Sequence, residues 1–231
     1  MSLAIFTIDD VSSRNTRAIT AYLVEKDIVP VLFAVGENVL KHYDEAIYAV
    51  SKGMIVGNHS FSHPAFSELT LNEAISEIEK CEKVLDQLYK DASVTRKYRP
   101  FRFPYGNKGG ENKIAIQSYL RENGFHKLDD RKISFPWWRE NELNTDIDTF
   151  WTFDFEEYRI AWNDGFTREC SLAKMEDPNP SRGGALYGKD HLNIVLTHAI
   201  DETEALWPGY YKEMIERSIA NGVTFIHPEF L

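Results

Sequence analysis

The chain has 231 residues, and its 26 Lys and Arg against 36 Asp and Glu give a net charge of −10, which argues against nucleic-acid binding. Apolar residues make up 43% and aromatic residues 13% of the chain, enough for a large core, so general disorder is excluded. With two cysteines and seven histidines, a disulfide framework and a thiolate zinc cluster are also excluded, so His and carboxylate side chains would have to hold any catalytic metal.

Short apolar runs alternate with helical patterns along the whole chain. The predicted strands cover residues 4–8, 29–35, 54–58, 100–103, 125–128, 150–155, 193–197 and 223–226. Several of these runs are too apolar for strict alternation, which is typical of parallel strands covered on both faces. The clearest predicted helices lie between the strands, at about 37–52, 70–89 and 111–123. Thr70 and Glu73 have the spacing of a capping box at the start of the second helix.

Repeated strand–helix units imply right-handed crossovers and a parallel sheet, either open or closed into a barrel. About eight predicted strands in one chain of this length favour a single-domain barrel that covers residues 1–231. One polar stretch, residues 158–191, interrupts the alternation and contains Asn-Asp-Gly, Asp-Pro-Asn-Pro and Arg-Gly-Gly. We expect a long loop excursion over one end of the barrel, which is either functional or disordered.

The sequence contains no run of eighteen apolar residues, so we expect no membrane insertion. The first apolar segment, residues 3–8, is too short for the core of a signal peptide and lacks a basic lead. As it stands, the sequence favours the cytoplasm, and a periplasmic or secreted location stays open if a signal peptide was removed. The oligomeric state is also left open.

Residues of catalytic types follow the predicted strands at the end where parallel α/β folds bind their ligands. These residues are Asp9, Asp10, His59, His63, Arg102, Tyr105, Asp154 and His198. Each has an ordinary structural explanation when taken alone, such as a helix cap, a surface histidine, a turn or an ion pair. Their concentration at one predicted rim is what indicates a catalytic site.

The spacing of His59 and His63 lets both imidazoles face one point if the segment turns helically. Neutral imidazole is a good ligand for zinc and related ions. Two imidazoles and one carboxylate would leave coordination positions of the metal open for water and substrate. Asp9 and Asp10 would point to opposite sides of an extended chain, which suits one carboxylate on a metal and the other on a water. An isolated H-x-x-x-H is more often a surface or capping pair, but its place directly after a strand favours a metal site.

In combination, these motifs resemble the polysaccharide deacetylase family, the NodB-homology domain of carbohydrate esterase family 4. Three family motifs, T-F-D-D, H-[ST]-x-x-H and R-x-P-Y-G, correspond to T-I-D-D at 7–10, H-S-F-S-H at 59–63 and R-F-P-Y-G at 102–106. The fourth, D-x-x-D-W, is approximated by D-F-E-E-Y at 154–158. The fifth, an apolar strand that ends in His, corresponds to I-V-L-T-H at 194–198. The motifs occur in family order and cover nearly the whole chain.

The resemblance implies a distorted (β/α) barrel with about seven parallel strands. It also implies a metal-dependent hydrolase that removes acetyl groups from an N-acetylated sugar or polysaccharide. The divalent ion would be held by Asp10, His59 and His63, with zinc as the usual ion and cobalt or another transition metal as alternatives. The Tyr105 backbone N–H would help to stabilise the oxyanion, and Leu196 would line the pocket for the acetyl methyl.

The same resemblance assigns the acid–base roles. Asp9 would be the general base, held by Arg102, and His198 would be the general acid, tuned by Asp154. These roles are chemically consistent, since an acetamide needs an activated water and its amine leaving group needs a proton.

Departures from the family pattern bear on the substrate. The fourth motif has Glu157 and Tyr158 in place of Asp and Trp, Thr197 precedes the last His, and the gap between motifs four and five is unusually long. Aromatic residues at 135–138 are expected either to stack on sugar rings or to pack in the barrel. Two other functions stay open: an amidohydrolase for a small non-sugar amide or cyclic imide, and a catalytically inactive glycan-binding relative.

Overall fold

The computed structural model describes residues 2–188 and 191–231. Met1 and residues 189–190, which belong to the predicted domain and excursion, lie outside the described residues. Six parallel strands in the described chain form one sheet. In order across the sheet they are β3 (Ile55–Asn58), β2 (Val31–Ala34), β1 (Ser2–Val11), β5 (Leu192–His198) and β4 (Phe153–Asp154), with β6 (Val223–Phe225) paired to the start of β1.

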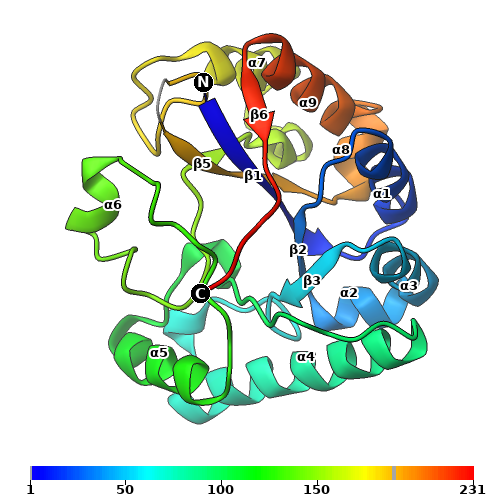
Figure 1. Cartoon of the computed structure of the whole chain (residues 1–231), viewed down its shortest axis with the longest axis vertical. Helices are drawn as coiled ribbons and strands as arrows, with labels where there is room; N and C mark the ends of the chain where they lie inside the picture. The colour runs from blue at the N-terminus through cyan, green and yellow to red at the C-terminus, as the bar shows by residue number, and fades with distance from the viewer. Residues whose placement is uncertain (1, 189–190) are drawn as a thin grey trace.

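Helices surround the strands as an outer layer, and α4 runs along one side of the molecule next to α5 (Figure 1). The helices are α1 (Thr16–Glu25), α2 (Gly36–Lys41), α3 (Tyr43–Ser51), α4 (Leu71–Asp91), α5 (Lys113–Glu122), α6 (Pro136–Glu140), α7 (Arg168–Glu176), α8 (Asp201–Leu206) and α9 (Tyr210–Ala220). Short 3-10 turns occur at η1 (Phe66–Glu68), η2 (Pro104–Gly106), η3 (Gly110–Asn112) and η4 (Glu157–Trp162). None of the helices in the described residues has the length and apolar character needed to cross a membrane.

The barrel-like α/β fold is confirmed, with six strands in the described residues where about seven were expected. The segment predicted as a strand at 100–103 forms only an isolated bridge, from Phe101 to Asn58 of β3. Prolines at positions 100 and 104 flank it, and proline removes the N–H that a ladder needs. Two backbone hydrogen bonds join this segment to Asn58, and on its other side the Thr149 N–H donates to the Phe101 C=O at 2.7 Å, so a few hydrogen bonds close the ring between β3 and β4.

The segment predicted as a strand at 125–128 is also reduced to a bridge, because the C-terminal segment occupies its hydrogen-bonding groups. Leu128 pairs with Phe230 in an antiparallel bridge. The Asp129 N–H donates to Glu229, and the Leu231 N–H donates to Lys127. This segment therefore pairs with the end of the chain and does not extend the parallel sheet.

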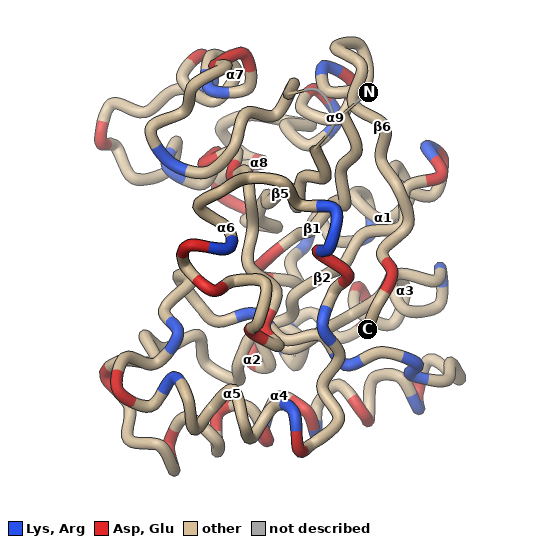
Figure 2. The backbone as a smooth tube through the Cα atoms, turned by 60° about the vertical axis from the view of Figure 1, so that its left-hand side comes forward, with Lys and Arg blue, Asp and Glu red and all other residues tan. Residues whose placement is uncertain are grey.

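The predicted capping box is confirmed at the start of α4, where Thr70 and Glu73 exchange hydrogen bonds. The helix predicted at 37–52 is divided into α2 and α3 at His42, whose ψ of 51° is not helical. The polar stretch at 158–191 contains α7, whose Ser171 hydroxyl donates to the Phe155 C=O at 2.8 Å. Figure 2 shows acidic and basic residues interspersed along α4 and α5.

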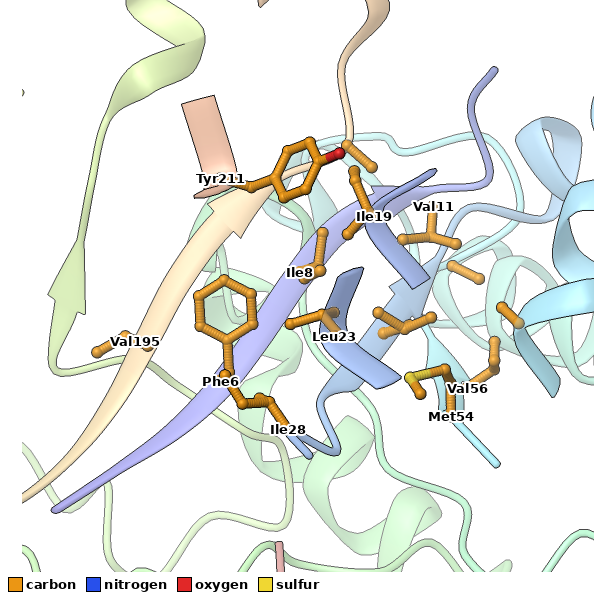
Figure 3. Packing of buried hydrophobic residues seen from close by; sticks show 14 of the residues in the cluster. Phe6, Ile8, Val11, Ile19, Leu23, Ile28, Met54, Val56, Val195 and Tyr211 are labelled. Atoms are coloured by element: carbon orange, nitrogen blue, oxygen red, sulfur yellow. The ribbon is translucent and has the colours of Figure 1, made fainter. Parts of the chain in front are cut away.

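Successive side chains of β1 point to opposite faces of the strand and belong to two different parts of the hydrophobic core. Phe6 and Ile8 point outward and pack against the helix layer, as Figure 3 shows for Ile19 and Leu23 of α1. Ile5 belongs to a second cluster inside the barrel, with residues of β2 and β5. Because side chains two residues apart share a face of a strand, Thr7 and Asp9 lie on the same inner face as Ile5. The strand period thus places Asp9 at the mouth of the barrel.

One stability prediction concerns Gly57 in β3, against which the chain at Pro100 packs closely. A Cβ at this glycine would lie 2.6 Å from the Pro100 carbonyl oxygen. We expect Gly57→Ala to lower the free energy of unfolding by about 1–3 kcal/mol, the usual cost of overpacking, as measured by urea denaturation. An unchanged unfolding midpoint would show that the 100–103 segment can shift away from β3 at no cost.

Candidate active site

Asp9 lies at the end of β1 and is held by the buried guanidinium of Arg102. The Arg102 Nη1 group donates to Asp9 Oδ1 at 2.7 Å and to Thr7 Oγ1 at 2.8 Å, and Nε donates to the Thr149 C=O at 3.0 Å. Arg102 is 0% exposed, and its guanidinium stacks 4.2 Å from the ring centre of Phe33. Burial raises the pKa of Asp9, but the charge and hydrogen bond of Arg102, together with the charges of His59 and His198, outweigh it and lower the pKa below its ordinary value. Asp9 is therefore an ionised carboxylate at neutral pH.

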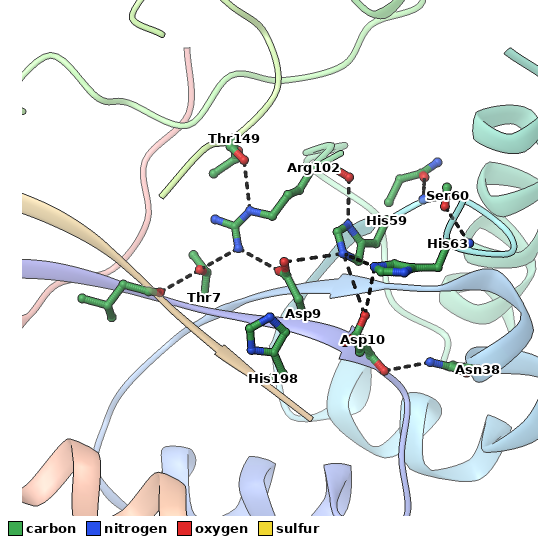
Figure 4. A network of polar contacts seen from close by, with 12 residues as sticks. Thr7, Asp9, Asp10, Asn38, His59, Ser60, His63, Arg102, Thr149 and His198 are labelled. Carbon is green, nitrogen blue, oxygen red and sulfur yellow. Dashed lines mark hydrogen bonds and ion pairs between the residues drawn. The ribbon is translucent and has the colours of Figure 1, made fainter. Parts of the chain in front are cut away.

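The backbone of Arg102 also orients His59. His59 Nδ1 lies 2.8 Å from the Arg102 C=O, and because a carbonyl only accepts, Nδ1 carries the proton. The lone pair of His59 therefore lies on Nε2. This atom is 3.2 Å from His63 Nε2 and 3.9 Å from Asp10 Oδ1, and His63 Nε2 is 3.4 Å from the same Asp10 oxygen. Figure 4 shows these side chains converging beside Asp9.

Asp10, His59 and His63 fit a divalent metal. Their ligand atoms lie within 4.8 Å of one another. Burial and the neighbouring His59 lower the pKa of His63 to about 4, so its imidazole is neutral at physiological pH and offers a lone pair. Two imidazole nitrogens and a carboxylate oxygen are a donor set that suits zinc and related transition metals.

Residues with a left-handed backbone conformation bring the three proposed ligands together. The expected helical turn between His59 and His63 is wrong, because Ser60 and His63 have φ values of 66° and 61°. The Ser60 N–H donates to Asn58 Oδ1, and the His63 N–H donates to Ser60 Oγ, so local hydrogen bonds fold the loop back on itself. Asp10 also has a positive φ, 63°, which turns it out of the extended chain.

The two carboxylates consequently do not point to opposite sides of the strand. Asp9 Oδ2 lies 3.5 Å and Asp10 Oδ1 lies 3.9 Å from His59 Nε2. Tyr105, in the R-F-P-Y-G turn, has a φ of 58° and packs its ring edge-on to His63 at 4.5 Å. Non-glycine residues in the left-handed region are costly, and they cluster at sites where function requires the geometry.

His198, at the end of β5, pairs with Asp9 in the register between β5 and β1. Its direct partner is Glu157, which is 0% exposed. Glu157 Oε1 accepts from the His198 backbone N–H at 2.6 Å and lies 3.1 Å from His198 Nδ1. Burial lowers the pKa of His198, but the charge and hydrogen bond of Glu157, together with the charge of Asp154, raise it to about 10.

Asp154, which was expected to tune His198, acts on it through its charge, whereas Glu157 makes the hydrogen bond. Asp154 Oδ1 accepts from the Glu156 N–H at 2.8 Å, and burial raises the pKa of Asp154 to about 6. The sequence contained a signal for Glu157, because it occupies the second acidic position of the fourth motif. Tyr158, the next residue, packs its ring edge-on to His198 at 4.5 Å.

A pocket of about 440 Å³ opens over these residues. Leu196, which is 1% exposed, is part of its wall, and Arg102 lies behind Asp9 without lining it. The pocket is lined by Asp9, Asp10, His59, His63, Tyr105, Trp151, Asp154, Tyr158, Trp162, Leu196, His198 and Ile200. The four residues that sequence reasoning did not assign are Trp151, Tyr158, Trp162 and Ile200.

Comparisons with known proteins agree with this picture. The polysaccharide deacetylase family model matches residues 2–126. The Bc1960 peptidoglycan N-acetylglucosamine deacetylase is 19% identical with a TM-score of 0.65, and the chitin deacetylase of Colletotrichum lindemuthianum is 18% identical with a TM-score of 0.65. Each match covers 96% of this chain and 84% of the other.

A third similar structure is BA3943 of Bacillus anthracis, described as a pseudoenzyme of carbohydrate esterase family 4. It is 19% identical with a TM-score of 0.64, and the match covers 97% of this chain and 63% of that one. At these identities the likeness concerns the fold. A search of curated proteins finds no match.

The contact between Glu157 and His198 generates a prediction that separates the two acidic neighbours. We expect Glu157→Gln to lower the pKa of His198 from about 10 toward its ordinary value of 6.5, because the bonded charge is lost and only the charges of Asp154 and Asp10 still oppose burial. Asp154→Asn, the matched control, should lower it less. The pKa is read from the His198 ring signals in an NMR titration. A larger effect of Asp154→Asn would contradict the assignment of Glu157 as the direct partner.

Proposed function

The chain belongs to the polysaccharide deacetylase family, and on this basis we propose that it is a metal-dependent hydrolase that removes acetyl groups from an N-acetylated sugar or polysaccharide. The observation that carries the proposal is the single pocket shared by a donor set for a metal, an ionised Asp9 and a histidine with a raised pKa. Hydrolysis of an acetamide needs these three functions in reach of one carbonyl group.

The proposed metal ligands are Asp10, His59 and His63. A divalent ion there, with zinc or cobalt as candidates for these donors, would polarise the acetyl carbonyl and lower the pKa of the attacking water. The Nδ1–H of His59 is held by a backbone carbonyl, so its Nε2 presents a lone pair in a fixed direction.

Acid and base are kept in opposite charge states by separate counterions. Asp9, held ionised by Arg102, takes the proton of the attacking water as the C–O bond forms. His198, held protonated by Glu157, donates its proton to the amide nitrogen as the C–N bond breaks, and the products are acetate and a free amine. Two groups whose surroundings push their pKa values apart are typical of such acid–base pairs.

The remaining predicted residues have supporting roles in this proposal. The Tyr105 backbone N–H would donate to the oxyanion, where a preorganised donor is most effective. Leu196 would pack against the acetyl methyl. Aromatic side chains at the rim, Tyr105 at 70% and Trp162 at 63% exposure, offer flat faces for a sugar ring and favour a sugar over a small amide.

The proposed base is tested by Asp9→Asn. We expect acetate release from N-acetylglucosamine oligomers to fall by about a hundredfold or more, the usual scale for an acid–base group, with metal supplied in the assay. Asp27→Asn, on an exposed residue with positive φ, is the matched control and should be neutral. Near-normal turnover in Asp9→Asn would rule out the assignment.

The metal ligands are tested by the double variant His59→Ala, His63→Ala. We expect it to lose bound zinc or cobalt, as measured by elemental analysis, because it lacks two of the three donors. His227→Ala, on an exposed histidine outside the pocket, should keep the metal. Treating the unmodified protein with EDTA should abolish acetate release, and added zinc or cobalt should restore it.

The same assays separate the alternatives. Full activity after chelation would contradict metal dependence. Acetate release from small amides alone would favour the amidohydrolase, and glycan binding without acetate release under any metal would favour the inactive relative.

A further inference from the structure

The loop that carries His59 and His63 is held from the side of α4, outside the catalytic pocket. Its first support is Asn58, the last residue of β3, which is 0% exposed. Asn58 Oδ1 accepts the Ser60 N–H at 2.8 Å, and Ser60 Oγ accepts the His63 N–H at 3.0 Å (Figure 4). The left-handed turn between the two histidines therefore starts from the Asn58 side chain.

The orientation of the Asn58 amide is fixed by acceptors on α4. Its Nδ2 group donates to Glu82 Oε1 at 2.9 Å and to the Ile78 C=O at 3.0 Å. A carboxylate and a carbonyl only accept, so the NH2 end of the amide has to face α4 and its oxygen has to face the Ser60 N–H. Glu82 thus determines which end of the amide is presented to Ser60.

Glu82 is an unusual residue for its position. The helix α4 lies wholly in the described part of the chain, and among its buried residues Glu82 is the only charged one. The neighbouring Ile78, Cys81 and Leu85 are 0% exposed and supply the apolar contacts of this face. A buried ion pair is often no more stable than apolar side chains of the same size, so the charge indicates a requirement other than helix packing.

Two arginines keep the Glu82 carboxylate ionised and in place. Arg96 Nη1 donates to Glu82 Oε2 at 2.8 Å, Arg96 Nη2 donates to Oε1 at 3.0 Å, and Arg99 Nε donates to Oε2 at 2.8 Å. Burial raises the pKa of Glu82, but the charge and hydrogen bonds of Arg96, together with Asn58 and Arg99, lower it below its ordinary value. A side chain held by several charge-assisted bonds is a fixed support for the residue that it contacts.

From these contacts we propose that Glu82 is a positioning residue for the proposed metal site. Through Asn58 and Ser60, it holds the two histidine ligands in their converging arrangement before a metal binds. Glu82 itself does not line the catalytic pocket. Outer residues that orient metal ligands usually contribute about ten- to a hundredfold to metal affinity. The inference rests on the proposed metal-dependent function and specifies what preorganises its metal site.

A second carboxylate of α4 holds the same loop from its outer side. Glu77 Oε2 accepts the Phe61 N–H at 3.2 Å, the Ser62 N–H at 2.8 Å and the Ser62 hydroxyl at 3.0 Å. Ser62 is exposed, so water competes for the same donors. The loop therefore depends more on the buried Glu82 than on Glu77.

The test measures zinc affinity by competition with a chromophoric chelator, starting from the metal-free protein. We expect Glu82→Gln, which keeps the size of the side chain and removes its charge, to weaken zinc binding by about ten- to a hundredfold. Acetate release by this variant should recover as zinc is raised to saturation, because the variant lacks an ordered metal site and not a reacting group. Unchanged zinc affinity in Glu82→Gln would overturn the proposal, and so would a loss of acetate release that saturating zinc does not reverse.

Two variants of the same helix are matched controls. Glu79→Gln makes the same charge change at an exposed position of α4, and Leu85→Ala removes apolar packing from its buried face. Both should keep the zinc affinity of the unmodified protein, although Leu85→Ala lowers the stability to urea. Equal weakening of zinc binding in Leu85→Ala would show that helix packing alone sets the metal site and would overturn the role of Glu82.

A second measurement needs no variant at position 82. Hydrogen exchange in the metal-free, unmodified protein, followed by NMR, should show a protected Ser60 N–H, because Asn58 holds it without a metal. Free exchange of this N–H until zinc is added would overturn the proposal, because the metal would then order the loop. If the protein binds no zinc at all, the proposed function fails. The exchange rate of the Ser60 N–H in Glu82→Gln, raised or unchanged, then still decides whether Glu82 orders the loop.

Discussion

The active-site region depends on the buried contact between Arg102 and Asp9. Removing a guanidinium from water costs several kcal/mol, and here the carboxylate, the Thr7 hydroxyl and the Thr149 carbonyl compensate for it. The same residue accepts the Nδ1–H of His59 through its own carbonyl. One arginine therefore ties together β1, the segment that closes the barrel and a proposed metal ligand. Its buried Nη2 has no hydrogen-bond partner among the described residues, so the arrangement is not optimised for stability alone.

A second buried ion pair, between Glu157 and His198, complements the first. Asp9 and His198 are register partners on adjacent strands, yet each has a counterion from a different part of the chain. If Asp9 and His198 had no counterion except each other, one proton could pass from the imidazolium to the carboxylate and neutralise both groups. Separate counterions keep a carboxylate and an imidazolium side by side, which is the condition that amide hydrolysis imposes on its base and acid.

Much of the fold and most of the candidate site could be predicted from local patterns. The capping box at Thr70, the inner-face position of Asp9 and the strand-end positions of His59 and His198 follow from spacing within a few residues. The prolines at 100 and 104 are a local reason why the 100–103 segment forms only a bridge. The bridge at Leu128 could not be predicted, because it depends on which distant segment packs beside its hydrogen-bonding groups. Phe230 takes the place of a parallel neighbour at Leu128 for that reason.

By itself, the sequence determined which residue types stand at the carboxyl ends of the strands, since strand period and motif order are local properties. Only the tertiary structure decided which acidic residue touches His198, because Asp154 and Glu157 are three positions apart and the 3-10 turn that begins at Glu157 buries that side chain against His198. A hollow of about 330 Å³ that adjoins the catalytic pocket has the same origin. Arg182 and Trp137 are 45 residues apart in the numbering, and contacts of Gly183 and Gly184 with Thr152 and Phe135 bring their segments together. Such contacts depend on the packing of distant backbones, which no short pattern encodes.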